Sequence, residues 1–261
     1  MATQLRYIPH TILHVRNWWT LFLTLVTLRD GPTIYQLRHG PAIRTKEGVD
    51  AVTLFGIVVR QDYGEVQGDP IIVDVGAHIG IYSVFCASQT RNATIYAYEP
   101  VLENFLQMQE NIQKNGLESH IHPFRLAVAG SRGKRQLHVG QASPFHSLYP
   151  TSLTTGRSIE IDSVTLQDCF LQNGIGECDM LKVDCEGAEF ECLYEAPPEI
   201  LRKIKNIYLE YQNQWDHPRY TITDLTAFLQ NHGFLLRRLR RYSPNSGLAW
   251  FGRDSGQLRP A

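Results

Sequence analysis

The chain has 261 residues, of which 43% are hydrophobic and 20% are charged, a balance that excludes wholesale disorder and low-complexity structure. The 25 Lys and Arg residues nearly equal the 26 Asp and Glu residues, so the global basic excess of a general nucleic-acid binder is absent. The length favours one domain, or one and a half, with a core large enough to need no disulfide or metal.

The five cysteines, at positions 86, 169, 178, 185 and 192, are scattered and form no C-x-x-C pair. An odd, scattered set favours reduced thiols over a disulfide framework or a zinc site. The start of the sequence also lacks the pattern of a cleavable signal peptide. These features predict a protein of a reducing compartment, and we expect it in the cytoplasm.

Residues 1–68 differ in pattern from the rest, and we expect them to form a cap of helix and short strands. An apolar-rich helix is predicted over residues 10–28, where a Gly-Pro pair soon ends it. The pieces that follow are strand-like at Thr33–Leu37 and Ala42–Thr45, and then an apolar run at residues 51–60.

The aromatic part of that predicted helix has two interpretations. Trp18, Trp19 and Phe22 either pack within the cap or form an interfacial membrane helix or a dimer contact. The apolar stretch is shorter than the roughly 18–20 residues that a membrane-spanning helix needs. We therefore expect no transmembrane segment, while peripheral membrane contact of residues 10–28 and the oligomeric state stay open.

From residue 69 to residue 254, apolar and β-branched runs alternate with helical stretches, which predicts parallel strands joined by crossover helices. The predicted strands are Ile71–Val75, Thr94–Tyr98, His122–Ala127, Asp179–Val183 and Ile207–Tyr211, and the predicted helices are Ile79–Ser88, Glu103–Asn115, Phe190–Glu195 and Thr223–His232. Two last strands, Leu235–Tyr242 and Leu248–Arg253, form an antiparallel hairpin. The predicted fold class is α/β, with a doubly wound, mostly parallel seven-stranded sheet.

Residues 131–178 form a long insertion between the third and fourth predicted strands. Strand-like alternation at Gln136–Val139 and Ser158–Val164 indicates an insertion at the edge of the sheet. The loop at residues 141–156 is either a lid over a substrate or a plain surface loop. Residues 255–261 are expected to form a tail.

The strongest local signal is a buried strand that carries an acid and is followed by a glycine turn that opens a helix, over residues 71–80. Gly76 can adopt a backbone conformation closed to other residues, and Gly80 lets the helix pack tightly on the sheet. The free amides at the helix start can meet a polar ligand group, at the crevice where doubly wound sheets bind ligands. The candidate cofactor-binding residues of this turn are Asp74, Gly76, Ala77, His78 and Gly80.

Glu99 ends the next predicted strand, where an acid accepts hydrogen bonds from both ribose hydroxyls of a nucleotide. Dinucleotides and S-adenosyl-L-methionine share this requirement. His78 stands where the dinucleotide fingerprint has its middle glycine, which favours S-adenosyl-L-methionine, whose ammonium group Asp74 can approach. Alternatively, Asp74 and Glu99 only cap the turn and the next helix. Further candidates beside the adenine and ribose are Pro100, Ala127 and Val128.

A second group of carboxylates ends the fourth and fifth predicted strands. Lys182 and Asp184 share one side of their strand, Glu186 follows, and Glu210 ends the next strand. Charges on a buried strand are costly unless they pair or face a ligand, so this group is either a structural ion pair with a helix cap or a site for substrate and cofactor. Three carboxylates can hold Mg²⁺, but nothing in the spacing demands a metal, and no metal site is predicted.

Four segments together resemble one enzyme family: VDVGAHIGIYS (73–83), YAYEP (96–100), the spaced Asn111 and Asn115, and above all LKVDCEGAEFECL (181–193). They resemble the FkbM-type methyltransferases, a branch of the class I S-adenosyl-L-methionine-dependent enzymes, over roughly residues 33–252. His78 departs from the Asn usual there. The resemblance implies methyl transfer from S-adenosyl-L-methionine, with S-adenosyl-L-homocysteine as product, to a hydroxyl of a sugar, a glycolipid or another small natural product.

For that reaction the candidate bases are Asp184 and Glu186 first and then Glu210, because a carboxylate within reach of the hydroxyl can take its proton. Asp184 is also a candidate cofactor contact. The competing functions are a non-catalytic cofactor-binding scaffold, a nicotinamide-dependent oxidoreductase, and a methyltransferase acting on RNA or protein. The basic stripe at residues 237–241 would favour an RNA methyltransferase only if its arginines contact phosphates. We expect no nucleic-acid partner.

Overall fold

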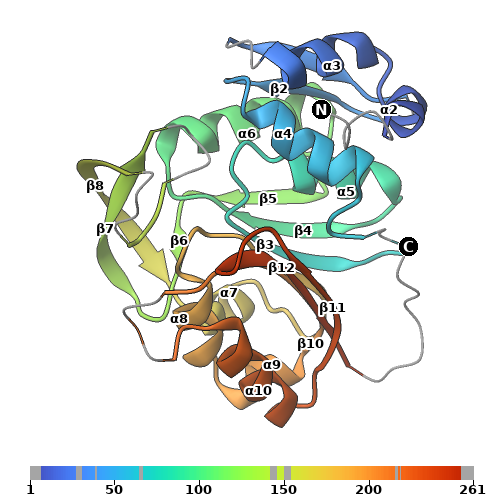
Figure 1. Cartoon of the computed structure of the whole chain (residues 1–261). Helices are drawn as coiled ribbons and strands as arrows, with labels where there is room; N and C mark the ends of the chain where they lie inside the picture. Colours follow the sequence, from blue (N-terminus) through green and yellow to red (C-terminus); the bar gives the residue numbers. More distant parts are fainter. Residues whose placement is uncertain are drawn as a thin grey trace.

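A seven-stranded, mostly parallel sheet runs through the centre of the molecule in this computed structural model (Figure 1). The structure describes residues 7–27, 31–38, 40–64, 67–141, 146–149, 154–214, 217 and 219–253. The strands are β3 (Ile71–Val75), β4 (Thr94–Tyr98), β5 (Ile121–Phe124), β9 (Cys178–Val183), β10 (Ile204–Gln212), β11 (Leu235–Arg241) and β12 (Ser246–Gly252), in the order β11-β12-β10-β9-β3-β4-β5. The predicted fold class is confirmed, with the antiparallel β12 inserted between β10 and β11.

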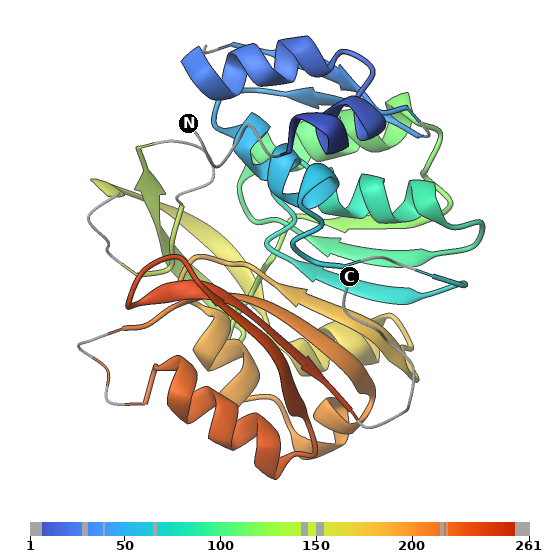
Figure 2. The same cartoon turned by 45° about the vertical axis from the view of Figure 1, so that its right-hand side comes forward.

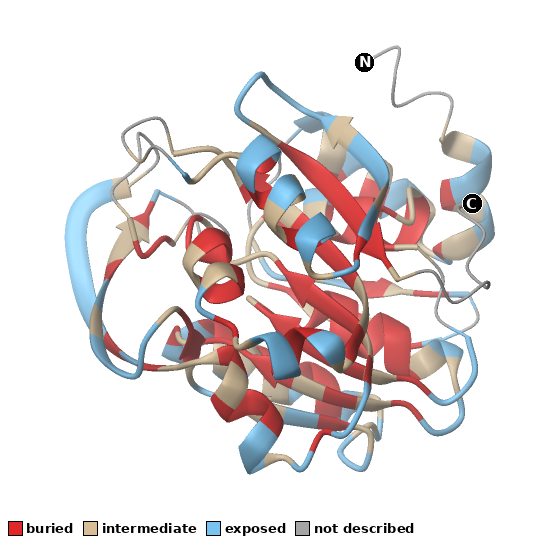
Figure 3. Cartoon of the chain, turned by 90° about the horizontal axis from the view of Figure 1, so that it is seen from below, coloured by how far each residue is buried: buried red, intermediate tan, exposed pale blue. Residues whose placement is uncertain are grey.

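Helices cover both faces of this sheet because successive residues of each buried strand point to opposite sides. In β3, Ile72 joins the core under α5 (Ile81–Gln89) and α6 (Leu102–Lys114). Val73 and Val75 instead join the core under the second helix layer. That layer contains α7 (Leu166–Gln172), α8 (Glu189–Tyr194), α9 (Pro198–Arg202) and α10 (Ile222–Asn231). Figures 2 and 3 show the two layers and the buried strands between them.

The third predicted strand was placed too far along the chain. It ends at Phe124, opposite Tyr98, the last residue of its only neighbour β4. Ala127 and Val128 leave the main sheet and form β6, which pairs with β8 (Thr154–Val164). An edge strand has ladder partners on one side only, so it stops where that partner stops.

The insertion at residues 131–178, predicted to lie at the edge of the main sheet, contributes two strands to a separate small sheet and then α7 to the second helix layer. β7 (Gly133–Gly140) pairs antiparallel with β8, and β6 completes the order β6-β8-β7. The ladder bonds of β7 are therefore satisfied by β8 rather than by β5. Half of the loop at residues 141–156, and the whole tail at residues 255–261, lie outside the described residues.

The predicted helix over residues 10–28 is instead two helices, α2 (Ile8–His14) and α3 (Trp18–Thr27). The break follows from a polar residue between them. Asn17 donates from Nδ2 to the Ile34 carbonyl at 2.8 Å and accepts the Gln36 N–H at 2.9 Å. It thus satisfies main-chain groups of β1 (Thr33–Gln36), which pairs with β2 (Ala42–Thr45). None of the helices in the described ranges is long and apolar enough to cross a membrane.

The apolar run at residues 51–60 forms α4 (Asp50–Leu54) and continues as one π-helical turn, η1 (Phe55–Val59). Leu54 and Val58 are buried in the same core as Ile72 and Ile79 of the main sheet and its first turn. The N-terminal segment therefore shares its core with one face of the main sheet.

Two side-chain amides, one on α6 and one at its C-terminal cap, hold β2 against that helix. Asn111 accepts the Arg44 N–H at 2.8 Å and donates to the carbonyls of Arg44 and Ile79. Asn115 accepts the Ala42 N–H and donates to the same residue's carbonyl. Each amide thus supplies the edge of β2 with the donor and acceptor that a neighbouring strand would offer.

We expect Asn111→Ala to lower the free energy of unfolding by about 2–4 kcal/mol, because it leaves buried main-chain groups of Arg44 and Ile79 without partners. Urea unfolding measures this change. Gln113→Ala, on the exposed side of the same helix, is the control and should change stability by less than about 0.5 kcal/mol. Equal losses in the two variants would contradict the role of Asn111.

Candidate functional site

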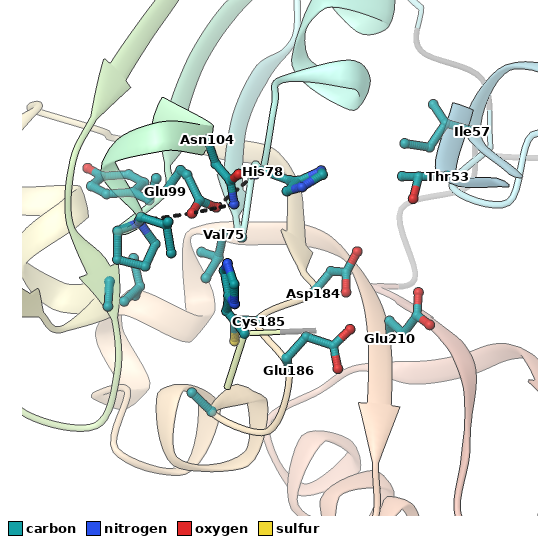
Figure 4. A pocket seen from close by; sticks show the side chains of 18 of the residues that line it. Thr53, Ile57, Val75, His78, Glu99, Asn104, Asp184, Cys185, Glu186 and Glu210 are labelled. Atoms are coloured by element: carbon teal, nitrogen blue, oxygen red, sulfur yellow. Dashed lines mark hydrogen bonds between the residues drawn. The ribbon is translucent and has the colours of Figure 1, made fainter. Parts of the chain in front are cut away.

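A cavity of about 420 Å³ opens at the carboxyl ends of β3, β4, β9 and β10, between the main sheet, β6 and α4 with η1 (Figure 4). This volume lies in the range of small-molecule sites. The predicted site residues that line it together are Gly76, His78, Glu99, Pro100, Ala127, Val128, Asp184, Glu186 and Glu210. Asp74, Ala77 and Gly80 lie outside the lining.

The turn after β3 is shaped by close backbone contacts. Gly76 has a φ of +74°, and a Cβ there would lie 1.8 Å from the carbonyl oxygen of Asp184. Glycine is therefore required here because the ends of β3 and β9 approach each other closely. This contact within the protein restricts the position more tightly than a bound ligand would. The N–H groups of Gly76 and Ala77 both donate to the Tyr98 carbonyl, so they are already used within the fold.

Gly80 has a different packing role from the one predicted. It begins α5 in the left-handed conformation, with a φ of +80°. A Cβ at this position would lie 2.8 Å from Cγ of Met108 on α6. The residue thus allows α5 to approach its neighbouring helix rather than the sheet.

Asp74 lies beneath the cavity, fully buried, and is already paired. Its carboxylate receives hydrogen bonds from Lys182 Nζ at 3.0 Å and from Ser83 Oγ at 2.6 Å. Lys182 also donates to the Gly76 carbonyl and lies 3.6 Å from the Asp184 carboxylate. Burial lowers the pKa of Lys182, but attraction to Asp74 and Asp184 outweighs burial and leaves that pKa above its usual value.

Glu99 lines one end of the cavity. Its carboxylate accepts the His78 N–H at 2.9 Å, the Val101 N–H at 2.9 Å and the Asn104 amide at 3.4 Å. It therefore holds the main chain just before α6 and also faces the cavity. Burial raises the pKa of Glu99 to about 7, although these hydrogen bonds oppose the shift.

At the other end, one tyrosine joins two of the predicted acids. Tyr63 Oη lies 3.0 Å from Asp184 Oδ2 and 3.3 Å from Glu210 Oε2. Burial, followed by repulsion from Asp184, raises the pKa of Glu210 to about 8. Sequence reasoning missed Tyr63 because no motif surrounds it and only the fold brings it within reach of strands more than a hundred residues away.

Glu186 follows Asp184 in a strained turn, with a φ of +51°. Its carboxyl receives a hydrogen bond from the Gln212 side chain. Burial, together with repulsion from Asp184 and Glu210, raises the pKa of Glu186 well above its usual value. Figure 4 shows the three acids on one side of the cavity, away from Glu99.

An apolar wall faces these acids from the N-terminal segment. It consists of Val49, Val52, Thr53, Gly56 and Ile57, from α4 and η1. The apolar run at residues 51–60 was the only sequence signal for this wall, and nothing in it indicated a site. π-Helical turns recur at functional sites, since they displace side chains from the regular helical rows.

Two histidines line the cavity beside the acids. Burial lowers the pKa of His78 to about 3, so its imidazole is neutral at pH 7. His146, from the part of the 141–156 loop that is described, accepts the Gly140 N–H at Nδ1. Within the described ranges, no three His, Cys, Asp or Glu side chains are arranged to hold a metal ion.

The basic stripe on β11 has partners within the protein. Arg240 forms an ion pair with Asp62 at 2.8 Å, and Asp62 lines the cavity. Arg238 stacks over the ring of Trp250 on β12. Arg240 therefore holds a residue of the cavity wall, whereas Arg238 packs on β12.

We expect Lys182→Met to lower the free energy of unfolding by about 3–5 kcal/mol at pH 7, because it leaves the buried Asp74 carboxylate without a counter-charge. Asp74→Asn in the same chain should restore part of the loss. Lys205→Met on β10 removes a surface ion pair and should cost about 1 kcal/mol or less. Chemical denaturation compares the three, and a loss for Lys182→Met no larger than that of the control would refute this account.

A family model for the methyltransferase FkbM domain matches residues 74–236. The chain is 25% identical over 208 residues to a methyltransferase, sdnD, of Sordaria araneosa, covering 69% of this chain and 79% of that one. It is 22% identical over 199 residues to the 31-O-demethyl-FK506 methyltransferase FkbM of Streptomyces tacrolimicus, covering 65% and 74%.

Among solved structures, the methyltransferase FkbM of Methylobacillus flagellatus is 16% identical with a TM-score of 0.47, covering 71% of this chain and 44% of that one. The family match spans the glycine turn after β3, Glu99, and the acids that end β9 and β10. The chain belongs to the FkbM methyltransferase family and is a methyltransferase.

Proposed function

We propose that this enzyme transfers the methyl group of S-adenosyl-L-methionine to a hydroxyl of a small natural product, with sugars and glycolipids among the candidates. The observation that carries the proposal is one cavity with two chemically different ends. Glu99 lies at one end beside apolar surface, and Asp184 with Glu210 and Tyr63 lies at the other. A cofactor and an acceptor can thus meet between them. The 31-O-demethyl-FK506 methyltransferase is named for an oxygen acceptor, which agrees with this choice.

The Glu99 end suits an adenosyl group. A carboxylate has about four acceptor positions, so Glu99 can accept ribose hydroxyls beyond the bonds it already receives from His78 and Val101. Ala127, Val128 and Leu148 offer a small apolar surface of the kind that suits an adenine ring. Bound there, S-adenosyl-L-methionine supplies an electrophilic methyl group on its sulfonium.

At the acidic end, we assign Asp184 as the base because the Lys182 ammonium lies beside it. Burial and repulsion raise the pKa of Glu210 to about 8, so most of it is protonated at pH 7, and they raise the pKa of Glu186 as well. Tyr63 Oη lies within hydrogen-bond distance of both Asp184 and Glu210, but it has one hydrogen and can donate to only one of them at a time. Lys182, 3.6 Å away, balances the charge of Asp184. Asp184 thus accepts the acceptor's proton as the new C–O bond forms.

The remaining contribution of the chain is positioning. Methyl transfer requires the acceptor oxygen, the methyl carbon and the sulfur to lie in line, and holding them so removes several kcal/mol from the barrier. The apolar wall of α4 and η1 faces the acids and restricts water at the acceptor. Such a wall suits an acceptor with an apolar body beside its hydroxyl.

Glu99→Gln tests the ribose contact. Ribose hydroxyls prefer the ionised carboxylate, and the pKa of Glu99 is about 7. The affinity for S-adenosyl-L-homocysteine should therefore be constant above about pH 8. Below pH 7 it should fall by up to about tenfold per pH unit. The variant should bind more weakly at pH 8 and lose most of this pH dependence. Isothermal calorimetry measures the affinity. The control variant is Glu103→Gln, because Glu103 is exposed on the neighbouring helix α6. Identical pH profiles for Glu99→Gln and the wild type would exclude the contact.

Asp184→Asn tests the base. A panel of sugars, glycolipids and apolar alcohols, assayed with methyl-labelled cofactor, first identifies an acceptor. On that acceptor Asp184→Asn should lower kcat by about 10²–10⁴, while Glu210→Gln, which mimics the protonated acid, should stay within about threefold at pH 7. The proposal fails if Glu210→Gln is the more damaging change, or if only amines are methylated.

A further inference from the structure

We propose that α3 (Trp18–Thr27) docks this enzyme on an anionic lipid surface, lying flat in the interface rather than crossing the bilayer. α3 leaves three large apolar side chains in water: Trp19 is 54% exposed, Leu23 43% and Val26 44%. Their spacing of four and three residues puts them on one face of the helix. Phe22, partly exposed, stacks on Trp19.

The opposite face of α3 is already committed to the fold. Leu21 is fully buried, and Thr24 accepts a hydrogen bond from Tyr35 of β1 at 3.0 Å. The helix therefore cannot turn its exposed face inward without breaking the packing on β1. Because α3 lies at the outside of the molecule in Figures 1 and 2, this face is open to a partner.

The charge around this face selects the partner. Residues 1–46 contain six basic residues and one acidic residue, whereas residues 47–261 contain 19 basic and 25 acidic residues. Arg44 and Lys46 pair with Glu110 and Glu103 on α6. Arg16 and Arg38 are exposed, and no ion pair between described residues involves either of them. Both lie near the N-terminal end of α3, where Arg16 donates to the Arg38 carbonyl. An apolar helix face with exposed basic residues beside it is the pattern of helices that bind anionic membrane surfaces.

The same charges argue against a second copy of the chain as the partner. A symmetric dimer contact places identical patches against each other, so the basic residues of two copies would meet. An anionic bilayer instead offers headgroups to Arg16 and Arg38 and acyl chains to Leu23 and Val26. Trp19, with an apolar ring and a polar N–H, suits the boundary between the two.

The test is co-sedimentation of the full chain with phosphatidylcholine vesicles that contain about 30 mol% phosphatidylserine, or none. We expect binding to the anionic vesicles and at least tenfold weaker binding to neutral ones. Trp19→Ser with Leu23→Ser should reduce binding at least tenfold, and Arg16→Glu should reduce binding to anionic vesicles. Leu171→Ser is the matched control, because Leu171 is 60% exposed on α7, in the helix layer on the other face of the sheet.

Binding needs neither cofactor nor acceptor, so its result is independent of the proposed reaction. Circular dichroism verifies that the variants are folded. The proposal is overturned if the chain does not bind anionic vesicles, if it binds neutral ones equally well, or if the double variant binds like the wild type. A dimer in sedimentation velocity that the double variant abolishes, without vesicle binding, would assign the face to a second copy instead.

Discussion

A buried ammonium group joins the strands on which the site depends. Lys182 on β9 bonds to Asp74 and to the Gly76 carbonyl of the neighbouring β3, and lies close to Asp184. A lone charge at this depth is strongly unfavourable, so the two carboxylates and the carbonyl are required around it. The result fixes the ends of β3 and β9 relative to each other, which positions the turn at Gly76 and the acid at Asp184 together.

The site is completed by a part of the chain far from its strands. Tyr63, η1 and α4 come from the N-terminal segment, yet they face acids on β9 and β10 across one cavity. The amides of Asn111 and Asn115 bond this segment to α6, and the segment also packs into an apolar core that it shares with the main sheet. The acidic end of the cavity is therefore built from two parts of the chain, the strands β9 and β10 and the N-terminal segment.

Three acids, Asp184, Glu186 and Glu210, lie close together at one end of the cavity. Glu186 and Glu210 have raised pKa values, because burial and the charge of Asp184 both disfavour a second anion. Tyr63 Oη lies within hydrogen-bond distance of both Asp184 and Glu210 and so links two of the three acids.

The sequence by itself determined the α/β class, the five parallel strands within a few residues, the hairpin, and the acids that end β4, β9 and β10, because hydrophobic period and glycine turns are local signals. The sequence also indicated Asp74 and Lys182 as notable charged residues on buried strands. It did not indicate that they pair, because they lie on different strands. Only the tertiary structure decided that Asp74 lies beneath the cavity, that β7 and β8 form a separate sheet with β6, and that Tyr63 lies between two carboxyls. These outcomes depend on contacts between residues distant in the chain, on which local patterns carry no information.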